Sequence, residues 1–348
     1  MTFLVNQARQ LKLDGRWDVT YFTAPRSREQ LVAAVGTDHV RTPFRVAPGY
    51  VRRFAWEQVT LPRILRDEGF DLLYAPGGFA ALRSSVPQVV VDHNAFHHAG
   101  WDELGSLKNW MRFRVERWLA RLSARRAEAV VYLSRAFADA MLRVGFPEPT
   151  AIIGSGVSTD WPSSGSSLLA CDVCSERGYV LAVHNWTPAK RLDWLLDAWS
   201  ETAGREGPPH LVLVGSPVNG DVEASVRGRL EQPRLRECVH VYESATRAQV
   251  ARFYEAARLY VSTSTLEAFP LTPYEAMHFG VPCVLSDIAE HREVAGDAAA
   301  YFRPLEASSF RDAIGRAEAL RSKLISDGRK RVSAATWARN VDEFSRLF

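Results

Sequence analysis

Short apolar runs alternate with longer amphipathic stretches along the whole chain. This alternation is typical of parallel β-sheets whose strands are connected by covering helices. In the first half of the chain, the apolar runs predict strands at residues 18–22, 70–75, 88–92, 129–133 and 151–154. In the second half, they predict strands at residues 179–183, 210–215, 239–242, 259–262, 283–286 and 300–302. The pattern predicts two doubly wound α/β domains that face each other across a cleft, with ligands bound beyond the carboxyl ends of the strands.

The segment between the two sets of strands is rich in Ser, Gly and Pro at residues 158–167, which indicates a linker. A chain of 348 residues also exceeds what one hydrophobic core usually supports. Near the end, Trp337, Val341 and Phe344 recur at helical spacing. We therefore expect a first domain over residues 1–157, a linker over 158–177, a second domain over 178–333 and a terminal helix over 334–348.

The segment 264–277 carries two glutamates, Glu267 and Glu275, on either side of an apolar turn that contains proline. Thr272 suits a helix N-cap and Pro273 the first helical position, which places Glu275 third. A helix that begins here points backbone N–H groups and its positive dipole end outward, which favours phosphate, and the glutamates could accept hydrogen bonds from sugar hydroxyls. The alternative is an ordinary capping box without any function.

Composition is that of a globular protein, with 47% hydrophobic and 24% charged residues. The 43 basic and 40 acidic residues leave a net charge of +3, too small to indicate nucleic acid as a partner. No uninterrupted apolar run is long enough to span a bilayer, and the first residues lack the charged start of a signal peptide. We therefore expect a soluble, cytoplasmic protein.

The four cysteines fit a reducing compartment. Cys171 and Cys174 form a Cys-x-x-Cys pair, whereas Cys238 and Cys283 are isolated. A zinc site needs further ligands near such a pair, and a thioredoxin-like motif needs to follow a strand and open a helix. Because the chain also has no Asp-x-Asp metal motif, we expect no bound metal.

Several segments resemble, in order, the motifs of family 4 of the retaining glycosyltransferases, which have the GT-B fold. These segments are the strand, basic loop and helix at 179–183, 188–191 and 195–199, the strand at 211–215, the paired glutamates at 267–275, and their continuation at 276–284. The likeness covers most of the chain and is most specific over residues 179–304. It implies retaining, metal-independent transfer of a hexosyl group from a nucleotide sugar to a glycan or lipid-linked acceptor, in surface polysaccharide assembly. It also implies that the terminal helix crosses back to the first domain, and that no cofactor is needed besides the nucleotide sugar as co-substrate.

The same resemblance implies roles for individual residues. Lys190 would contact the donor diphosphate, Glu275 the ribose and Glu267 the donor sugar. In the first domain, His93 would orient and polarise groups near the donor sugar and acceptor rather than act as a nucleophile, with His97 and His98 on the acceptor side. The catalytic candidates are His93 and Glu267, and the donor-binding candidates are Asn185, Lys190, Arg191, Gly215, Ser244, Ala245, Phe269, Leu271, Thr272 and Glu275.

The chain departs from the family pattern at several places. His184 and Asn185 stand where the family often has glycine and sometimes arginine, so one phosphate-binding cation is missing unless Arg191 or another basic residue replaces it. Pro270 removes one backbone donor from the loop between the glutamates. Family members also open with a strand and a glycine-rich loop, whereas residues 2–11 here already predict the first helix. We therefore expect the first domain to lack its first strand, which would leave unpaired edges on both neighbouring strands.

Two alternatives keep the fold but change the activity. One is a catalytically silent protein that binds nucleotide sugars, and the other is a sugar-nucleotide epimerase or phosphorylase. A nicotinamide oxidoreductase is disfavoured because Gly154 and Gly156 lack the third glycine of the dinucleotide-binding fingerprint.

Residues 108–126 predict a basic amphipathic helix, with arginines on one side and Met111, Val115 and Trp118 on the other. One interpretation is a helix whose apolar side faces the core and whose arginines face solvent. The other is a surface that contacts anionic lipid at the inner face of the membrane, which would suit a lipid-linked acceptor.

Overall fold

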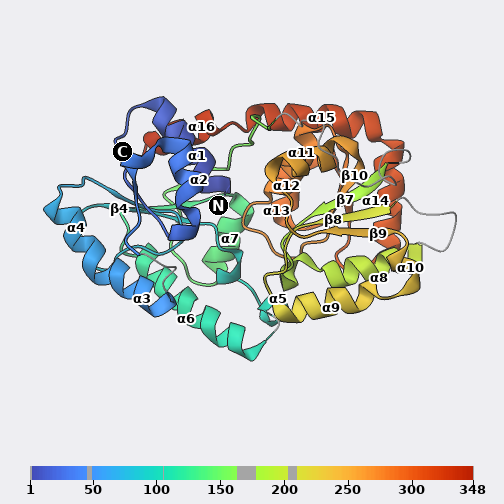
Figure 1. Cartoon of the computed structure of the whole chain (residues 1–348), viewed down its shortest axis with the longest axis horizontal. Helices are drawn as coiled ribbons and strands as arrows, with labels where there is room; N and C mark the ends of the chain where they lie inside the picture. Colours follow the sequence, from blue (N-terminus) through green and yellow to red (C-terminus); the bar gives the residue numbers. More distant parts are fainter. Residues whose placement is uncertain (1, 45–48, 105, 163–177, 203–209, 348) are drawn as a thin grey trace. The chain divides into compact units, whose positions relative to one another are not determined.

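The computed structural model describes residues 2–44, 49–104, 106–162, 178–202 and 210–347 (Figure 1). Contacts divide the chain into two compact units. Unit 1 comprises Met1–His98, Phe113–Ser158 and Ala335–Phe348, and unit 2 comprises Ala99–Arg112 and Thr159–Ala334. Most of the predicted linker, with Cys171 and Cys174, lies outside the described residues.

Unit 2 is built on one sheet of six parallel strands in the order β12-β11-β10-β7-β8-β9. The strands are β7 (Tyr179–Val183), β8 (His210–Val214), β9 (Val239–Tyr242), β10 (Ala257–Ser262), β11 (Cys283–Ser286) and β12 (Ala299–Phe302). The helices are α5 (Trp101–Leu104), η5 (Pro188–Lys190), α8 (Leu192–Thr202), α9 (Gly220–Leu230), α10 (Pro233–Arg236), α11 (Arg247–Ala256), α12 (Leu271–His278), α13 (Ala289–Ala295), η6 (Gly296–Ala298), α14 (Ala307–Ala319) and α15 (Arg321–Ala334). Helices α8 and α9 lie on one face of the sheet, and α11 and α12 lie on the other (Figure 1). The predicted doubly wound arrangement is confirmed.

The core of unit 2 consists mostly of Val, Leu and Ala, and it includes a cluster of aromatic side chains between the sheet and helices α8 and α14. Trp194 stacks on Phe302 with ring centroids 5.7 Å apart, and Phe310 meets both rings edge-on. Trp199 is also buried here. Because rings of this size bury large apolar areas, they fix α8 and α14 firmly against the strands.

Unit 1 holds two separate parallel sheets, β1-β2 and β3-β4-β5-β6. The strands are β1 (Tyr21–Phe22), β2 (Val40–Arg41), β3 (Leu73–Ala75), β4 (Gln88–Asp92), β5 (Ala129–Tyr132) and β6 (Ala151–Ile152). The helices are α1 (Thr2–Asp14), α2 (Pro25–Val35), η1 (Thr37–His39), α3 (Tyr50–Ala55), η2 (Trp56–Thr60), α4 (Leu61–Asp67), η3 (Ala95–His97), α7 (Arg135–Arg143) and α16 (Trp337–Ser345). Helix α6 (Leu107–Ala124) belongs to unit 2 up to Arg112 and to unit 1 from Phe113 onward. Within the part of the chain that the structure describes, β1 and β3 each have one edge without a partner strand.

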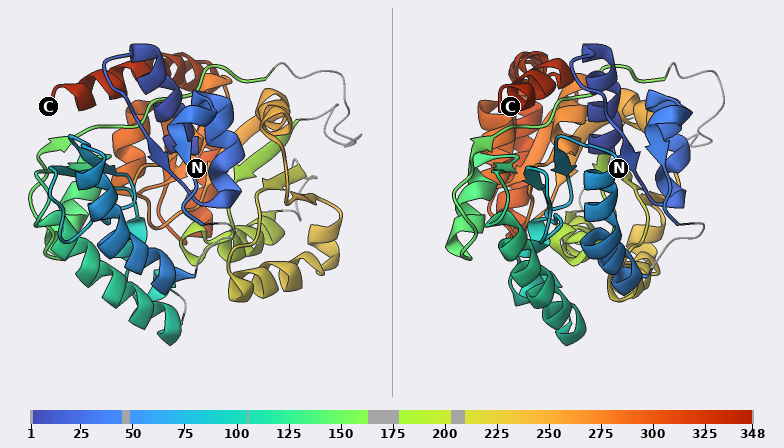
Figure 2. Two further views of the ribbon diagram at one scale, coloured as in Figure 1. Left: turned by 60° about the vertical axis from the view of Figure 1, so that its left-hand side comes forward. Right: turned by 90° about the vertical axis from the view of Figure 1, so that its left-hand side faces the viewer.

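The last helix, α16, packs against the first helix, α1, within unit 1 (Figures 1 and 2). A chain of buried amides connects them. The Gln7 side chain donates to Asn340 at 3.0 Å, Asn340 donates to the Gly154 carbonyl at 2.8 Å, and the Tyr74 hydroxyl donates to Gln7 at 2.8 Å. Because buried amides without partners cost free energy, this network specifies where α16 sits.

Two details of unit 1 differ from the sequence pattern. Strand β2 was not predicted, since its two residues are too few for an alternating pattern to be recognised. The interpretation of α6 as a helix with a core-facing apolar side is wrong, because Met111, Val115 and Trp118 are exposed. Its buried side consists instead of small residues such as Ala120, while Arg121 lies over the Phe146 ring.

The tightest backbone approach in unit 2 lies at Gly215, directly after β8. Its φ is +139°, and a Cβ atom added there would lie 2.0 Å from the His184 carbonyl oxygen. We expect Gly215→Ala to lower the free energy of unfolding by more than about 3 kcal/mol, because the backbone after β7 must move. Urea denaturation followed by tryptophan fluorescence measures this.

Gly220→Ala is the matched control, because no atom lies within 4 Å of an added Cβ at Gly220. It begins α9, where alanine should change stability by less than about 1 kcal/mol. Equal stability of the two variants would contradict the steric argument.

Candidate active site

The donor-binding candidates gather at one edge of the unit 2 sheet. Strands β9, β8, β7 and β10 are neighbours in that order and run parallel, so their carboxyl ends meet at the same edge. Asn185 lies in the loop after β7, Gly215 follows β8, Ser244 and Ala245 follow β9, and Glu267 follows β10. Asn185 and Ser244 are exposed there, as ligand-binding residues need to be.

The centre of this edge is an ion pair between Lys190 and Glu267. The Lys190 Nζ donates a short hydrogen bond to Glu267 Oε1, and the side chains are only 21% and 12% exposed. Burial acts to raise the pKa of Glu267, but the Lys190 charge opposes it, with the net effect that the pKa is lowered. Glu267 is therefore ionised at neutral pH, and Lys190 has a charged partner.

Hydrogen bonds to backbone carbonyls connect the two loops that carry Lys190 and Glu267. The Thr263 hydroxyl donates to the Lys190 carbonyl at 2.7 Å, and the Thr265 N–H donates to the Ala189 carbonyl at 2.9 Å. Arg191 follows with a positive φ of 50°, an uncommon conformation for a residue other than glycine. Its Nε lies 3.6 Å from Asp193 Oδ1. The loops after β7 and β10 thus form one unit around the ion pair.

Two buried histidines, His184 and His291, feel the charges of Lys190 and Glu267. Burial, joined by the Lys190 charge, lowers the pKa of His184 to about 3, and burial also lowers the pKa of His291. The Nε2 atom of each ring is buried without a hydrogen-bond partner among the described residues. Sequence reasoning noted His184 only as a departure and missed His291, because a lone histidine in a charged helix gives no signal.

Glu275 lies on α12, where it accepts a hydrogen bond from the Tyr254 hydroxyl at 3.0 Å. Burial raises the pKa of Glu275 to about 7, although the Tyr254 hydrogen bond and the Arg247 charge both act to lower it. Its carboxyl group thus titrates near neutral pH. The two glutamates of the motif have pKa values shifted in opposite directions.

The predicted capping box at the start of α12 is wrong. The helix begins at Leu271, and the residue at its N-cap, Pro270, makes no side-chain cap hydrogen bond. Thr272 lies inside the first turn, where its hydroxyl accepts a hydrogen bond from Tyr260 at 2.6 Å. Glu275 is therefore two residues further into the helix than predicted, and it contacts Tyr254.

An aromatic cluster adjoins Glu275. Tyr254 stacks on Phe279 with centroids 5.4 Å apart, and Trp161 meets Phe279 edge-on at 5.1 Å. Arg247 lies over the Trp161 ring at 4.8 Å. The predicted donor-binding residue Phe269 lies apart from this cluster and packs on Tyr274. Aromatic faces of this kind can stack on a planar ring.

In unit 1, His93 directly follows β4 and is exposed. Its ring lies 5.9 Å from that of Phe3, which in turn meets Trp337 at 5.3 Å. Neighbouring groups remove part of its hydration, which lowers the pKa of His93. The ring is therefore neutral at pH 7 and can donate or accept a proton.

The loop that carries His93 is fixed by a buried pair. His97 Nδ1 and Asp92 Oδ2 are 2.6 Å apart, and both side chains are almost fully buried. The Asn94 N–H donates to Asp92 Oδ1 at 2.9 Å, and a Cβ on Gly78 would lie 2.9 Å from Asp92 Oδ2. His97 was predicted on the acceptor side, but it is 0% exposed and serves this pair instead. His98 is half-buried against Phe137.

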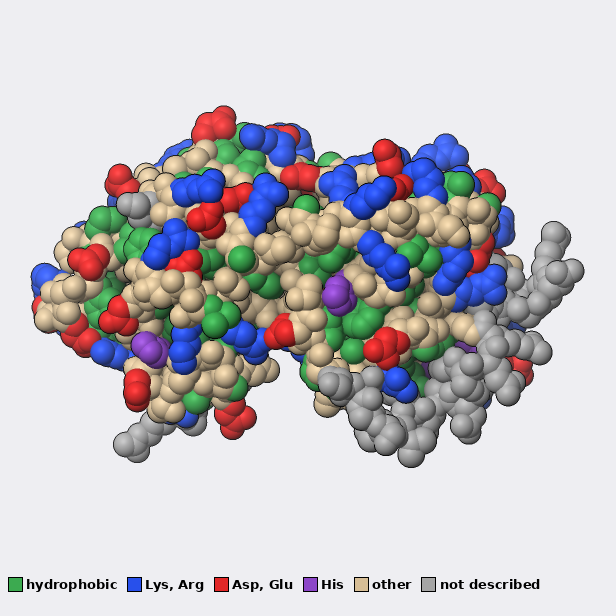
Figure 3. Space-filling model, turned by 90° about the horizontal axis from the view of Figure 1, so that it is seen from above, with side chains coloured by type: hydrophobic (Ala, Val, Ile, Leu, Met, Phe, Trp, Pro, Cys, Tyr) green, Lys and Arg blue, Asp and Glu red, His purple; other side chains and the backbone are tan. Residues whose placement is uncertain are grey.

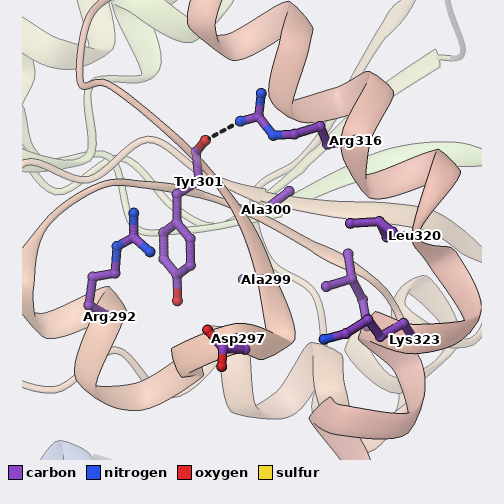
Figure 4. Close-up of a pocket in the computed structure, with 9 residues that line it drawn as sticks. Arg292, Asp297, Ala299, Ala300, Tyr301, Arg316, Leu320 and Lys323 are labelled. Atoms are coloured by element: carbon purple, nitrogen blue, oxygen red, sulfur yellow. Dashed lines mark hydrogen bonds between the residues drawn. The ribbon is translucent and has the colours of Figure 1, made fainter.

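A pocket of about 370 Å³ lies beside the edge strand β12, away from the predicted residues (Figure 4). Three of its lining side chains are cations with partners. Arg292 lies 3.8 Å from the Tyr301 ring centroid, Arg316 donates to the Tyr301 carbonyl at 2.6 Å, and Lys323 pairs with Asp327 at 2.8 Å. The predicted catalytic and donor-binding residues do not line this pocket, so we do not place the active site here.

Two features are absent from the described residues. These residues contain no group of three or more His, Cys, Asp or Glu side chains placed to hold a metal ion. They also contain no helix that is both long and apolar enough to cross a membrane.

Comparisons with known proteins agree with the fold. The chain is similar to sucrose-phosphate synthase from Thermosynechococcus elongatus, with a TM-score of 0.76 at 17% identity over 99% of this chain and 90% of that one. It is also similar to HepE from Anabaena, solved in complex with UDP and glucose, with a TM-score of 0.74 at 20% identity over 99% and 94% of the two chains. An α,α-trehalose-phosphate synthase (UDP-forming) from Burkholderia vietnamiensis has a TM-score of 0.66 at 15% identity over 90% and 81%.

Sequence comparison gives the family. A curated Haemophilus influenzae protein described as an uncharacterized glycosyltransferase is 27% identical over 125 residues. The match covers 34% of this chain and 34% of that protein. The model for family 4 glycosyltransferases matches residues 2–161, and the model for group 1 glycosyl transferases matches residues 174–332. Together these two matches cover almost the whole chain. The chain therefore belongs to the group 1 glycosyl transferases, with a family 4 glycosyltransferase domain in its N-terminal half and the GT-B fold.

Proposed function

We propose that this glycosyltransferase is retaining and metal-independent, and that it moves a hexosyl group from a nucleoside diphosphate sugar to a glycan or lipid-linked acceptor. The observation that carries the proposal is the Lys190–Glu267 ion pair at the carboxyl edge of the unit 2 sheet, with Glu275 on the next helix. The similar HepE structure was solved in complex with UDP and glucose, which supports a nucleotide sugar as the donor. A role in surface polysaccharide assembly follows from the family resemblance.

In this proposal, the donor diphosphate lies between Lys190 and the N-terminus of α12. The leaving diphosphate gains negative charge as the glycosidic bond breaks, and a preorganised cation beside it stabilises the transition state. Lys190, Arg191 and the first backbone N–H groups of α12 would supply this stabilisation in place of a metal ion. Leu271 and Thr272 contribute through their backbone at the start of that helix.

Glu267 has two tasks in this proposal. Its carboxylate holds Lys190 in place, and its remaining lone pairs accept hydrogen bonds from hydroxyls of the donor sugar. Glu275 would accept hydrogen bonds from the ribose, while Ser244 and Ala245 would lie along the base. The neutral rings of His184 and His291 leave the positive charge of the site on Lys190.

His93 would act from unit 1. It is neutral, exposed and fixed by the Asp92–His97 pair behind it. We propose that it polarises and orients the acceptor or donor sugar. The acceptor would then attack on the face that the diphosphate leaves, so that the anomeric configuration is retained without a nucleophilic side chain.

The first test is binding of nucleoside diphosphates. At a ligand concentration of 100 times Kd, binding raises the free energy of unfolding by about 2.7 kcal/mol. We expect at least one of UDP, GDP and ADP to raise the melting temperature, and Lys190→Gln to abolish that rise because the phosphate charge loses its partner. Lys323→Gln is the control, since Lys323 is the cation of another ion pair of unit 2. No thermal shift with any nucleotide would refute the proposed donor.

The second test separates a transferase from a protein that only binds nucleotide sugars. We expect Glu267→Gln to lower kcat for transfer or donor hydrolysis by about 100-fold, because a charged group oriented toward the transition state is lost. The Kd for the nucleotide should change by less than about threefold, because the glutamine oxygen can still accept the Lys190 hydrogen bond and the carboxylate itself contacts the sugar. Glu318→Gln, which breaks the ion pair with Arg258, is the control. Undetectable turnover in the wild type, with nucleotide binding intact, would favour the silent binder.

The third test uses the raised pKa of Glu275. A carboxyl whose pKa rises on folding binds protons more tightly in the folded state, so its stabilising contribution is complete below pH 4 and is lost as pH rises through about 7. Glu275→Gln should therefore raise the free energy of unfolding at pH 8 relative to wild type, by about 1–3 kcal/mol, but not at pH 4.

The same variant should weaken nucleotide binding by about tenfold at pH 8, because an amide accepts fewer hydrogen bonds from ribose hydroxyls than a carboxylate. Urea denaturation and calorimetric titration measure the two quantities. Lower stability at pH 8 with unchanged nucleotide affinity would show a purely structural role for Glu275.

A further inference from the structure

Helix α6 carries a line of exposed apolar side chains. Leu107, Met111, Val115 and Trp118 are each between 58% and 60% exposed. Their spacing of four, four and three residues places them on one face of the helix. Single exposed apolar residues are ordinary on protein surfaces, but an aligned row marks a surface for interaction. We call these four residues the apolar stripe.

The opposite side of α6 is fixed by specific contacts, so the helix cannot rotate to bury the stripe. The Ala80 N–H donates to Ser123 Oγ at 2.6 Å, and Ala120 is fully buried. Phe113 stacks on Phe96 with centroids 5.1 Å apart. In both views of Figure 2, α6 is the long green helix near the lower edge.

The charge of this segment is unusual for the chain. Residues 107–126 contain seven basic residues and one acidic residue, a formal charge of +6, whereas the whole chain carries +3. The single acidic residue, Glu116, is buried, while Arg112 and Arg114 are exposed on either side of the stripe. By contrast, Figure 3 shows Lys and Arg side chains interspersed with Asp and Glu on the face that it draws.

Tryptophan extends the same surface at the start of the segment. Trp101 on α5 is 53% exposed, and its ring lies 6.3 Å from that of Trp110. Indole rings prefer the headgroup level of a bilayer, where their apolar body and polar N–H are both satisfied. The apolar stripe, the flanking arginines and these rings have the composition of a helix that lies in a membrane interface.

We propose that α6 docks this protein on the surface of an anionic lipid bilayer. The stripe would enter the boundary between headgroups and acyl chains, and the arginines would extend to lipid phosphates on either side. Two copies of the chain packed through this face would instead bring two segments of charge +6 together, which repel each other. The inference rests on α6 and stands independently of the proposed donor site.

Flotation with lipid vesicles tests this docking. We expect the wild type to float with vesicles of equal phosphatidylcholine and phosphatidylglycerol, to bind vesicles of phosphatidylcholine alone much more weakly, and to release at high ionic strength. Val115→Glu should reduce the partition coefficient by about tenfold, because it places a charge where the apolar stripe is buried. Val218→Glu is the matched control, since Val218 is 61% exposed in unit 2, and it should float like the wild type.

Three results would overturn the proposal. These are equal binding to both kinds of vesicle, unchanged binding of Val115→Glu, and a dimer in gel filtration that Val115→Glu converts to a monomer. The last of these would identify a second copy as the partner. Glu267→Gln should float normally, and Val115→Glu should still be stabilised by the nucleotide, so failure of the docking and failure of the donor site can be distinguished.

Discussion

The site in unit 2 depends on the parallel pairing of β7 with β10 at the middle of the sheet. From this pair, the chain runs outward to β8 on one side and to β11 on the other. The connections therefore diverge onto opposite faces of the sheet, and the loops at the carboxyl ends of β7 and β10 are left facing each other. Lys190 comes from one loop and Glu267 from the other. Their ion pair and the hydrogen bonds of Thr263 and Thr265 follow from this strand order.

The balance of charges at this edge suits binding better than it suits stability. A partly buried ion pair loses hydration on both sides and contributes little net stability, while the raised pKa of Glu275 means that its ionised form costs folding energy at neutral pH. Groups held in this way are characteristic of functional sites. The opposite pKa shifts of Glu267 and Glu275 arise because only Glu267 has a cation in direct contact. The same motif thus supplies one carboxyl that is ionised at neutral pH, Glu267, and one that titrates near neutral pH, Glu275.

Much of the fold could be predicted because the strands are buried runs with clear ends, and the site residues follow those ends. What could not be predicted depended on tertiary contacts. Thr272 has the chemistry of an N-cap, but Tyr260 takes its hydroxyl and the helix starts earlier. The charges of Lys190 and Glu267 act on His291 only because the fold brings these distant residues together. His97 is buried, where its ring pairs with Asp92. In α6, periodicity identified the apolar side correctly but could not tell which side packs on the protein.

The side of α6 that packs on the protein is made largely of small side chains. The side that packs on unit 1 offers Ala120, Ser123 and Ala124, which allow close approach of neighbouring backbone, and Arg121 covers Phe146 with its planar guanidinium. Leu107, Met111, Val115 and Trp118 lie on the other side and remain exposed. A helix selected only for stability would bury them. Their exposure is what the proposed docking on an anionic lipid surface explains, and the surrounding positive charge supports that proposal. Our two proposals assign donor recognition and surface attachment to separate elements, so a substitution in one is expected to leave the other intact.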